Sequence, residues 1–482
     1  MESLSTSLAS LRHVAVAYDQ ALTPAPLLNV VDTLADVAAV TPAEVRLFLC
    51  LLLAYPVALS WRALPPGPSG LFRHLFSVIV GGWMLQFANG YQIFLNLSSC
   101  LFCYLLMHLL GPYSAKTVSA VAILILAIGH LYRQITDYLG WTLDWTLVAM
   151  VTTQKIMGLA YNIQDGVDPH ATPEQTSRSV KKVPSLLEFL SFILFPANVV
   201  IGPSFEYSHY IAFATGQNVS PSPYLPGIWR LFQGLFYFVA HTAIALKFPC
   251  AALLSDPNFF KSGTFLTRYA AIWIALLAVR FKYYFGWKIA EGSACMSGLG
   301  FNGFEKATGK EKWDRVENVN VWKYETSGSL RTSSQNWNKT TNLWLRRYVY
   351  DRAPPSVNLY FTYLVSAFWH GFYPGYYMFF LSVAAATVVH RQVRRTMRLR
   401  FMKADGKTPG PLMPLYELCS FLATNITLNY FIMSFVMLAF NLSITAFKGF
   451  GFYGHWILLV SLILFNSGLI RAPAKKPAAK TQ

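Results

Sequence analysis

Long apolar stretches with few charges constrain this chain more than any other feature of its sequence. Segments of about 20 apolar residues follow one another over residues 46–471. The hydrocarbon core of a bilayer is about 30 Å thick, and a helix of roughly 20 apolar residues crosses it. Only 13% of the residues are charged, whereas soluble globular proteins contain about 25%. The sequence therefore predicts an all-α, polytopic membrane protein.

The apolar segments predict about eleven transmembrane helices, together with re-entrant or interfacial ones. The candidate segments lie near residues 46–63, 71–89, 91–111, 117–135, 139–163, 186–205, 226–248, 265–282, 283–300, 356–371, 372–390, 415–441 and 450–470. No internal repeat and no separate polar domain interrupts them. We therefore expect residues 46–471 to form a single helical membrane domain.

The two ends of the chain are predicted to lie outside this domain. Residues 1–45 are only mildly apolar, which favours amphipathic helices on the membrane surface. At the boundary, Thr41 can cap a helix, Pro42 suits its first position, and Glu44 can return the capping hydrogen bond. Residues 472–482 are predicted to form a basic, disordered cytosolic tail.

The formal net charge is +17, and the distribution of Lys and Arg predicts which loops face the cytosol. Residues 306–352 and 390–403 are basic, whereas residues 202–225 contain no Lys or Arg and are expected on the lumenal side. A partner rich in phosphate, such as a nucleotide-bearing cofactor or a phospholipid head group, would suit the same charge. Nucleic acid is not expected as a partner, because the basic residues are scattered among apolar segments.

If both basic loops are cytosolic, the chain between them must enter the membrane and return. Gly371, Pro374 and Gly375 would supply the helix break within residues 356–390. His370 directly precedes that break and lies deep in an apolar segment. An ionisable residue at membrane depth indicates function by default. A neutral imidazole bonded to a freed backbone carbonyl would instead be structural, and the local sequence favours neither interpretation.

A second group of polar residues lies on a helix predicted within residues 335–348. Asn338, Asn342 and Arg346 recur at every fourth position and would form a polar stripe. A neighbouring aromatic stripe consists of Trp337, Trp344 and Tyr348. An amphipathic interfacial helix with snorkelling arginines also explains this pattern, and the local sequence favours that interpretation.

Three other sequence features are considered as possible functional sites. Gly298, Gly300 and Gly303 form a G-x-G-x-x-G, but no strand–helix unit surrounds them. They are therefore expected to break a membrane helix rather than to bind a dinucleotide. Glu291, in an apolar run, is either a paired structural residue or part of a reaction chamber. The C-x-x-C at residues 100–103 lacks a second pair, so we predict buried thiols and no metal site.

Four stretches in the second half of the chain occur together in order. They are Ser297–Phe304, Lys312–Arg315 with Asn318–Trp322, Trp337-Asn338 with Trp344–Arg346, and Trp369–Gly371 with Pro374–Tyr376. In order and spacing they resemble the membrane-bound O-acyltransferase (MBOAT) family, and within it the lysophospholipid acyltransferase branch. The resemblance is dense over residues 280–380 and looser upstream. It implies an MBOAT-type helical bundle that transfers acyl chains to hydroxyl groups.

The resemblance also implies which residues act in catalysis. Asn338 and His370 match the family's paired catalytic Asn and His. A neutral His370 would take the proton of a lipid alcohol, and a general base contributes about 10²–10⁴ in rate. The Asn338 amide would stabilise the oxyanion formed from the thioester carbonyl, or it would orient a substrate. No acidic triad partner is evident near His370, so we expect direct transfer without an acyl-enzyme.

The resemblance makes acyl-CoA the expected co-substrate, and no metal or other cofactor is expected. Arg346 and Arg347, in the basic loop, are the candidates for binding its phosphates, because a guanidinium fork matches phosphate oxygens. Further substrate contacts are predicted at Trp337, Asn342, Trp344, Trp369 and Glu291.

A lysophospholipid is the expected acceptor. The sterol and diacylglycerol branch of the family carries F-Y-x-D-W-W-N before its Asn, whereas this chain has Gln335-Asn336-Trp337-Asn338. Acylation of a protein, peptide or sterol is the alternative within the family. A non-catalytic lipid transporter is the alternative of another class, because broken helices with polar residues at membrane depth fit transport as well. The family implies an integral, multi-pass protein of the endoplasmic reticulum.

Overall fold

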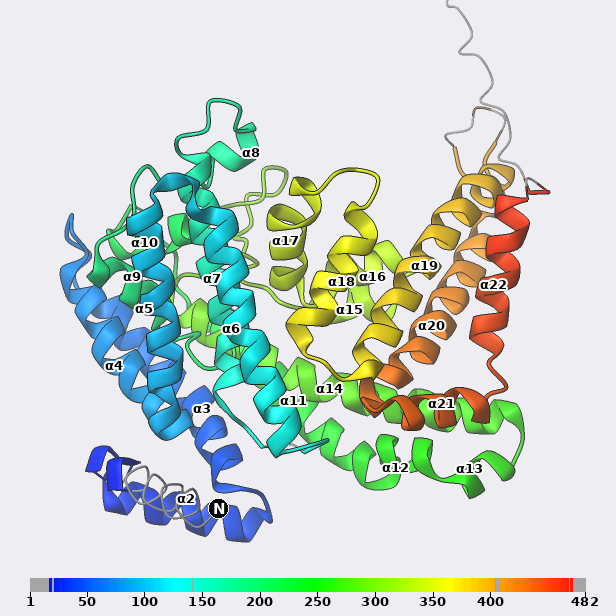
Figure 1. The fold of residues 1–482 in the computed structure, drawn as a ribbon, viewed down its shortest axis with the longest axis horizontal. Coiled ribbons are helices and arrows are strands. Elements are labelled where there is room, and N and C mark those ends of the chain that lie inside the picture. Colours follow the sequence, from blue (N-terminus) through cyan, green and yellow to red (C-terminus); the bar gives the residue numbers. More distant parts are fainter. Residues whose placement is uncertain are drawn as a thin grey trace, which may run out of the picture. The chain divides into compact units, whose positions relative to one another are not determined.

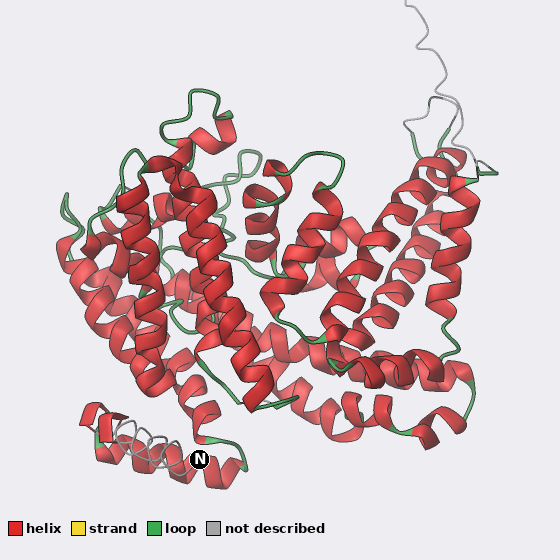
Figure 2. Cartoon of the chain, viewed as in Figure 1, coloured by secondary structure: helices red, strands yellow, loops and turns green. Residues whose placement is uncertain are grey.

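The computed structural model describes residues 17–19, 21–140, 142–217, 219–403, 405, 408–467 and 469–470. Within these ranges the chain forms helices joined by loops (Figure 2). The extended pairings in the same ranges are two isolated β-bridges, Phe304 with Glu311 and Met402 with Pro409. The all-α class predicted from the sequence is therefore confirmed. The predicted tail at 472–482 and the first 16 residues of the predicted interfacial segment lie outside the described residues.

The chain divides into two compact units, and each is described by itself. Unit 1 contains Met1–Ala240, Phe281–Asn318 and Leu343–Tyr348. Unit 2 contains His241–Arg280, Val319–Asn342 and Val349–Gln482. The prediction of one domain over residues 46–471 stays a prediction.

Unit 1 is built on helices that pack in sequence order. Its helices, wholly or in part, are α2 Ala25–Ala38, α3 Pro42–Ala63, α4 Leu71–Asn89, η1 Gly90–Gln92, α5 Ile93–Leu110, η2 Pro112–Ser114, α6 Ala115–Thr136, α7 Trp145–Asp165, α8 Pro173–Thr176, α9 Leu186–Ile193, α10 Tyr207–Ala214, α11 Tyr224–Lys247, α14 Phe265–Ser297 and α17 Lys339–Tyr348. Helix α4 packs between α3 and α9, and α7 packs against α5 and α6 (Figure 1). Helix α7 is buried along nearly its whole length.

The start of α3 follows the local chemistry of its sequence. The Thr41 hydroxyl accepts a hydrogen bond from the Glu44 N–H at 3.3 Å, and the Glu44 carboxylate accepts one from the Thr41 N–H at 2.9 Å. Pro42 occupies the first helical position, where its missing N–H costs nothing. The predicted capping box is confirmed. Helix α2, within the predicted interfacial segment 1–45, buries Val31 and Ala35.

Unit 2 is a group of long helices with shorter ones across their ends. Besides parts of α11, α14 and α17, it contains α12 Cys250–Ser255, α13 Pro257–Lys261, α15 Val321–Glu325, α16 Leu330–Asn336, η3 Tyr350–Arg352, α18 Asn358–His370, α19 Pro374–Met397, η4 Arg398–Phe401, α20 Met413–Met437, α21 Phe440–Gly449 and α22 Tyr453–Asn466. Helix α19 packs against α18, α20 and α22, which lie side by side in Figure 1. Helices α21 and α22 are bent by 84° at the loop between them. Aromatic and aliphatic side chains such as Tyr430, Phe431 and Phe447 form the core.

The expected number of membrane crossings is not confirmed. Among the described residues, five helical segments are long and apolar enough to cross a membrane, or six if the bent pair α21–α22 forms one span. Helix α14 is one continuous helix of 33 residues, although the sequence predicted two spans at 265–282 and 283–300. Helix α9 has only 8 residues, too few for the span predicted at 186–205.

The helix break predicted after His370 is confirmed. Helix α18 ends at His370, and α19 begins at Pro374. Gly371 has φ 120°, a backbone conformation that residues with a Cβ rarely adopt. The Gly375 N–H, in the first turn of α19, donates to the Leu438 carbonyl beyond the end of α20 at 2.7 Å. The first turn of α19 therefore bonds one of its N–H groups to a carbonyl outside its own helix.

Gly375 leaves no room for a side chain, because an added Cβ would lie 2.0 Å from the Ser434 carbonyl oxygen. We expect Gly375→Ala to lower the unfolding temperature in detergent, since overpacking costs about 1–3 kcal/mol. Gly67→Ala is the matched control, because a Cβ at Gly67 meets no atom within 4 Å. Equal unfolding temperatures for the two variants would show that α19 and α20 are not packed this closely.

Candidate active site

His370 is held in one tautomer by the helix that carries it. Its Nδ1 lies 2.6 Å from the carbonyl oxygen of Ser366, one turn back in α18. A carbonyl only accepts hydrogen bonds, so Nδ1 carries the hydrogen. In the neutral imidazole, Nε2 then holds the lone pair. The backbone contact expected of a structural histidine is therefore present, and the same contact leaves Nε2 able to accept a proton, as a catalytic histidine requires.

Four aromatic rings surround the imidazole. Ring centroids lie 4.7 Å away for Trp369, 5.7 Å for Tyr376, 5.0 Å for Phe380 and 5.3 Å for Phe435. Trp369 is buried and meets the imidazole edge-on. These rings fix the plane of His370 and make its surroundings apolar. The predicted contact of Trp369 with a substrate stays a prediction.

Asn338 does not lie on the helix where the sequence predicted it. Helix α17 begins at Lys339, and Asn338 precedes it with a left-handed φ of 45°. Asn tolerates this conformation better than most residues. Its carbonyl accepts the Asn342 N–H at 2.9 Å, so Asn338 closes the first turn. The polar stripe predicted from Asn338 through Arg346 is wrong at its first position, because the chain turns there.

The Asn338 side chain is half-buried, and its amide makes no hydrogen bond to any part of the chain that the structure describes. The neighbouring candidates are engaged within unit 2. Asn342 donates from Nδ2 to the Ser334 hydroxyl at 2.8 Å. The Trp337 ring packs against Tyr324 with a centroid distance of 4.9 Å. The side-chain amide of Asn338 can therefore still form hydrogen bonds to a ligand.

Asn338 and His370 both belong to unit 2, on chain segments that adjoin the same helix. Asn338 follows the end of α16 by two residues, and His370 ends α18. Helices α16 and α18 both pack against α19. Within the described ranges, no group of three His, Cys, Asp or Glu residues could hold a metal ion.

Glu291 lies in unit 1 and has charged partners there. Its Oε2 lies 2.7 Å from Lys288 Nζ and 3.4 Å from Arg230 Nε. Its Oε1 accepts the Asn318 N–H at 2.7 Å. The carboxylate is fully buried, and both oxygens are used by the protein itself. These contacts favour the paired structural role over the predicted contact with substrate.

The predicted phosphate-binding arginines differ from each other. Arg347 donates to Glu206 Oε1 at 2.9 Å and lies 3.5 Å from Glu174. Arg346 is exposed, whereas Trp344 is buried in unit 1.

Glu206 also binds a second residue of α17, because the Tyr348 hydroxyl donates to Glu206 Oε2 at 2.8 Å. Sequence reasoning missed Glu206, although a lone carboxylate within the Lys- and Arg-free segment was a signal.

The two predicted sides, lumenal for residues 202–225 and cytosolic for residues 306–352, are inconsistent with each other. Glu206 from the first segment pairs with Arg347 from the second, and His209 lines one pocket together with Arg315. Segments in contact do not lie on opposite sides of a bilayer. The structure therefore places the Lys- and Arg-free segment against basic residues of unit 1.

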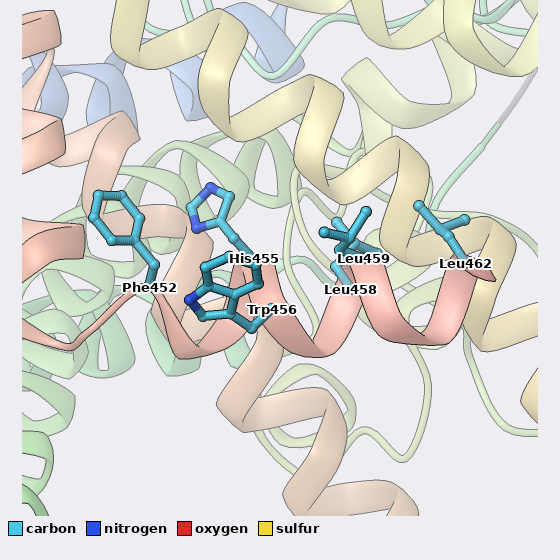
Figure 3. Close-up of a pocket in the computed structure, with 6 residues that line it drawn as sticks. All are labelled: Phe452, His455, Trp456, Leu458, Leu459 and Leu462. Carbon is cyan, nitrogen blue, oxygen red and sulfur yellow. The ribbon is translucent and has the colours of Figure 1, made fainter. Parts of the chain in front are cut away.

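An open apolar groove of about 410 Å³ runs along α22 in unit 2 (Figure 3). It is lined by Phe452, His455, Trp456, Leu458, Leu459 and Leu462. His455 is its one ionisable residue, and the Nδ1 of His455 is paired with the Tyr430 hydroxyl at 2.7 Å. None of the residues predicted to act in catalysis lines this groove, and it offers no second group for chemistry.

Glu291→Gln separates the two interpretations of that residue. Removing one partner from a buried ion pair typically costs about 3–5 kcal/mol, so we expect a large fall in unfolding temperature. Glu417→Gln, at an exposed position, is the matched control and should leave stability unchanged. Thermal unfolding of the purified variants checks this. An unchanged unfolding temperature with lost turnover would instead place Glu291 at the substrate.

Comparisons with known proteins identify the family. A family model described as MBOAT, membrane-bound O-acyltransferase family, matches residues 116–433. The chain is 30% identical over 450 residues to "Lysophospholipid acyltransferase" of Schizosaccharomyces pombe, covering 89% of this chain and 87% of that protein. It is 32% identical over 449 residues to "Membrane-bound glycerophospholipid O-acyltransferase 1" of Mus musculus, covering 88% and 89%. "Lysophospholipid acyltransferase 6" of Drosophila melanogaster is 31% identical over 456 residues, which are 89% of this chain and 62% of that protein. The chain belongs to the membrane-bound O-acyltransferase family.

Proposed function

We propose that this protein is a lysophospholipid acyltransferase, which transfers an acyl chain from acyl-CoA to the free hydroxyl of a lysophospholipid. Relatives with that printed name match most of the chain at about 30% identity. The observation that carries the proposal is the His370 imidazole, whose Nδ1 is bonded to the Ser366 carbonyl so that Nε2 holds the lone pair.

In the proposed reaction His370 is the general base. Nε2 takes the proton of the acceptor hydroxyl as its oxygen attacks the thioester carbonyl, and a C–O bond forms. The carbonyl oxygen becomes an oxyanion, which the half-buried Asn338 amide N–H stabilises. The C–S bond then breaks, and the thiolate of CoA takes the proton back from His370. The products are a diacyl phospholipid and free CoA.

Acyl-CoA as donor fits a site of this kind. An acyl chain gains about 0.8 kcal/mol for each CH₂ that it buries, and aromatic rings line the surroundings of His370. Arg346 is exposed and remains our candidate for a CoA phosphate, whereas Arg347 already has two carboxylate partners.

We also propose that the protein resides in the endoplasmic reticulum and crosses its membrane about eleven times. Helices α7, α14 and α19 are less apolar than the five segments above, because they carry polar and charged residues such as Lys155, Lys288 and Arg391. Their lengths of 21, 33 and 24 residues are nevertheless sufficient. At about 1.5 Å per residue, each spans about 30 Å or more.

Purified protein supplied with oleoyl-CoA should release CoA thiol only when a lysophospholipid is added. A panel of lysophospholipids that differ in head group should yield the matching diacyl phospholipids, detected by mass spectrometry. Sterol and peptide acceptors serve as comparison. Thiol release with a sterol or peptide and with no lysophospholipid would refute the proposed acceptor, and the absence of any acyl transfer would favour a transporter.

His370→Ala and Asn338→Ala should both remain folded and lose turnover. We expect losses of about 10²–10⁴ for the base and about 10²–10³ for the oxyanion donor. His170→Ala and Asn466→Ala remove exposed residues of the same types and should retain wild-type rates. Size-exclusion profiles check folding, and thiol release checks turnover. Full activity in folded His370→Ala would refute the mechanism.

A further inference from the structure

Helix α15 ends in a carboxylate that one buried arginine holds through two hydrogen bonds. Arg280 of α14 donates to Glu325 from Nε to Oε1 at 2.8 Å and from Nη2 to Oε2 at 3.1 Å. The Arg280 side chain is buried, and that of Glu325 is partly exposed. Two parallel hydrogen bonds fix the orientation of the pair as well as its distance. Both residues belong to unit 2, and the mechanism proposed above uses neither of them.

Helix α15 contacts the two residues that lead into Asn338. At its start, the Asn320 N–H donates to the Asn336 carbonyl at 3.1 Å. At its other end, the Tyr324 ring packs against Trp337 with a centroid distance of 4.9 Å. Asn336 and Trp337 directly precede the left-handed turn at Asn338. The place of the Asn338 amide therefore depends on where α15 lies.

Helix α15 depends on an anchor outside itself. It has only 5 residues, and isolated helices shorter than about 12 residues are marginal. Arg280 supplies that anchor from α14, a helix of 33 residues. The third nitrogen of its guanidinium, Nη1, donates to Oδ1 of the buried Asn429 in α20 at 2.9 Å. The same guanidinium therefore holds α15 and α20 together.

Helix α20 in turn contacts the proposed base. The centroid of the Phe435 ring in α20 lies 5.3 Å from that of the His370 imidazole. Arg280 thus joins the helix that contacts the turn at Asn338 to the helix that contacts His370. Loss of its hold on Glu325 releases α15 but leaves the contact with α20 in place, because Nη1 binds Asn429 independently. A change at Glu325 is therefore expected to act on Asn338 rather than on His370.

We propose that Glu325 is a positioning residue for the acyl-transfer site, which acts through α15 and Trp337 to place the Asn338 amide. An oxyanion donor is effective only at hydrogen-bond distance from the developing charge, and a misplacement of about 1 Å can cost about 10²-fold in rate. The inference rests on the proposed function, because Asn338 is the oxyanion donor of that reaction. Glu325 itself needs no contact with either substrate.

Glu325→Gln in the full-length protein in detergent tests the proposal. The amide has the size of the carboxylate but lacks its charge, so Arg280 holds it less tightly. We expect kcat, per folded molecule, to fall about tenfold to a hundredfold, since the oxyanion donor is displaced. KM for oleoyl-CoA and for the lysophospholipid should change by less than about twofold, because the lost contact is made in the transition state. Glu417→Gln, at an exposed position, is the matched control.

A double-mutant cycle separates positioning from a general structural role. In the Asn338→Ala background the amide is already absent, so Glu325→Gln should lower kcat by less than about twofold. A general structural role would give the same fold-change in both backgrounds. Equal fold-changes, or a wild-type kcat in Glu325→Gln, would overturn the proposal.

Hydrogen exchange provides a readout that needs no turnover. The Trp337 N–H bonds to the Ser333 carbonyl at 3.0 Å, and the Asn342 N–H bonds to the Asn338 carbonyl at 2.9 Å. Glu325→Gln should speed the exchange of these two N–H groups and leave exchange in α22 unchanged. If wild type shows no acyl transfer, the proposed function fails, but faster exchange would still show that Glu325 holds this turn. Unchanged exchange at both groups would contradict the positioning role by itself.

If Glu325→Gln fails to fold, Tyr324→Leu replaces it, because that variant removes the ring packed against Trp337 and leaves the ion pair intact. It should lower kcat in the same way and be non-additive with Asn338→Ala. Tyr324→Phe keeps the ring and should recover most of the loss. A wild-type kcat in folded Tyr324→Leu would refute the route through α15 and Trp337.

Discussion

A peptide group within the hydrocarbon core of a bilayer has no water to bond, so its N–H and C=O must find partners in the protein. This requirement accounts for the helices, and it also decides what happens where a helix ends. At the end of α18 the Gly371 N–H bonds to the Ala367 and Phe368 carbonyls, and the Gly375 N–H bonds to Leu438. The Ser366 carbonyl meanwhile accepts from His370 Nδ1. The same hydrogen-bonding requirement that stabilises the break thus selects the tautomer of the proposed base.

Charges in apolar surroundings obey a related rule. Burying an ionised side chain costs several kcal/mol, and the structure offsets that cost with partners brought from distant parts of the sequence. Glu291 pairs with Arg230 and accepts a hydrogen bond from the Asn318 N–H, and Arg347 pairs with Glu206. A charged residue in an apolar run therefore has two explanations, and the linear sequence does not show which one applies. Asn338 differs from these charged residues, because its side-chain amide makes no hydrogen bond within the described residues.

Features that depend on neighbouring residues were predictable from the sequence. The capping box at Thr41 and the break at Gly371 and Pro374 follow from side-chain chemistry within a few residues, and both are present. Features that depend on distant contacts were not. Asn338 leaves the helical path because the chain turns before α17, which periodicity does not reveal. Opposite sides were inferred for residues 202–225 and 306–352 from their Lys and Arg counts, and those counts do not reveal that Glu206 pairs with Arg347.

The environment of His370 also bears on the choice of acceptor. A thioester can be attacked by water as well as by a lipid hydroxyl, and a base exposed to solvent would serve both. Trp369, Tyr376, Phe380 and Phe435 surround the imidazole with rings whose faces offer water few hydrogen bonds. A lysophospholipid brings its hydroxyl on an apolar chain that is compatible with such rings, whereas water finds few hydrogen-bond partners on the ring faces. On the proposed mechanism, the aromatic shell therefore favours transfer over hydrolysis.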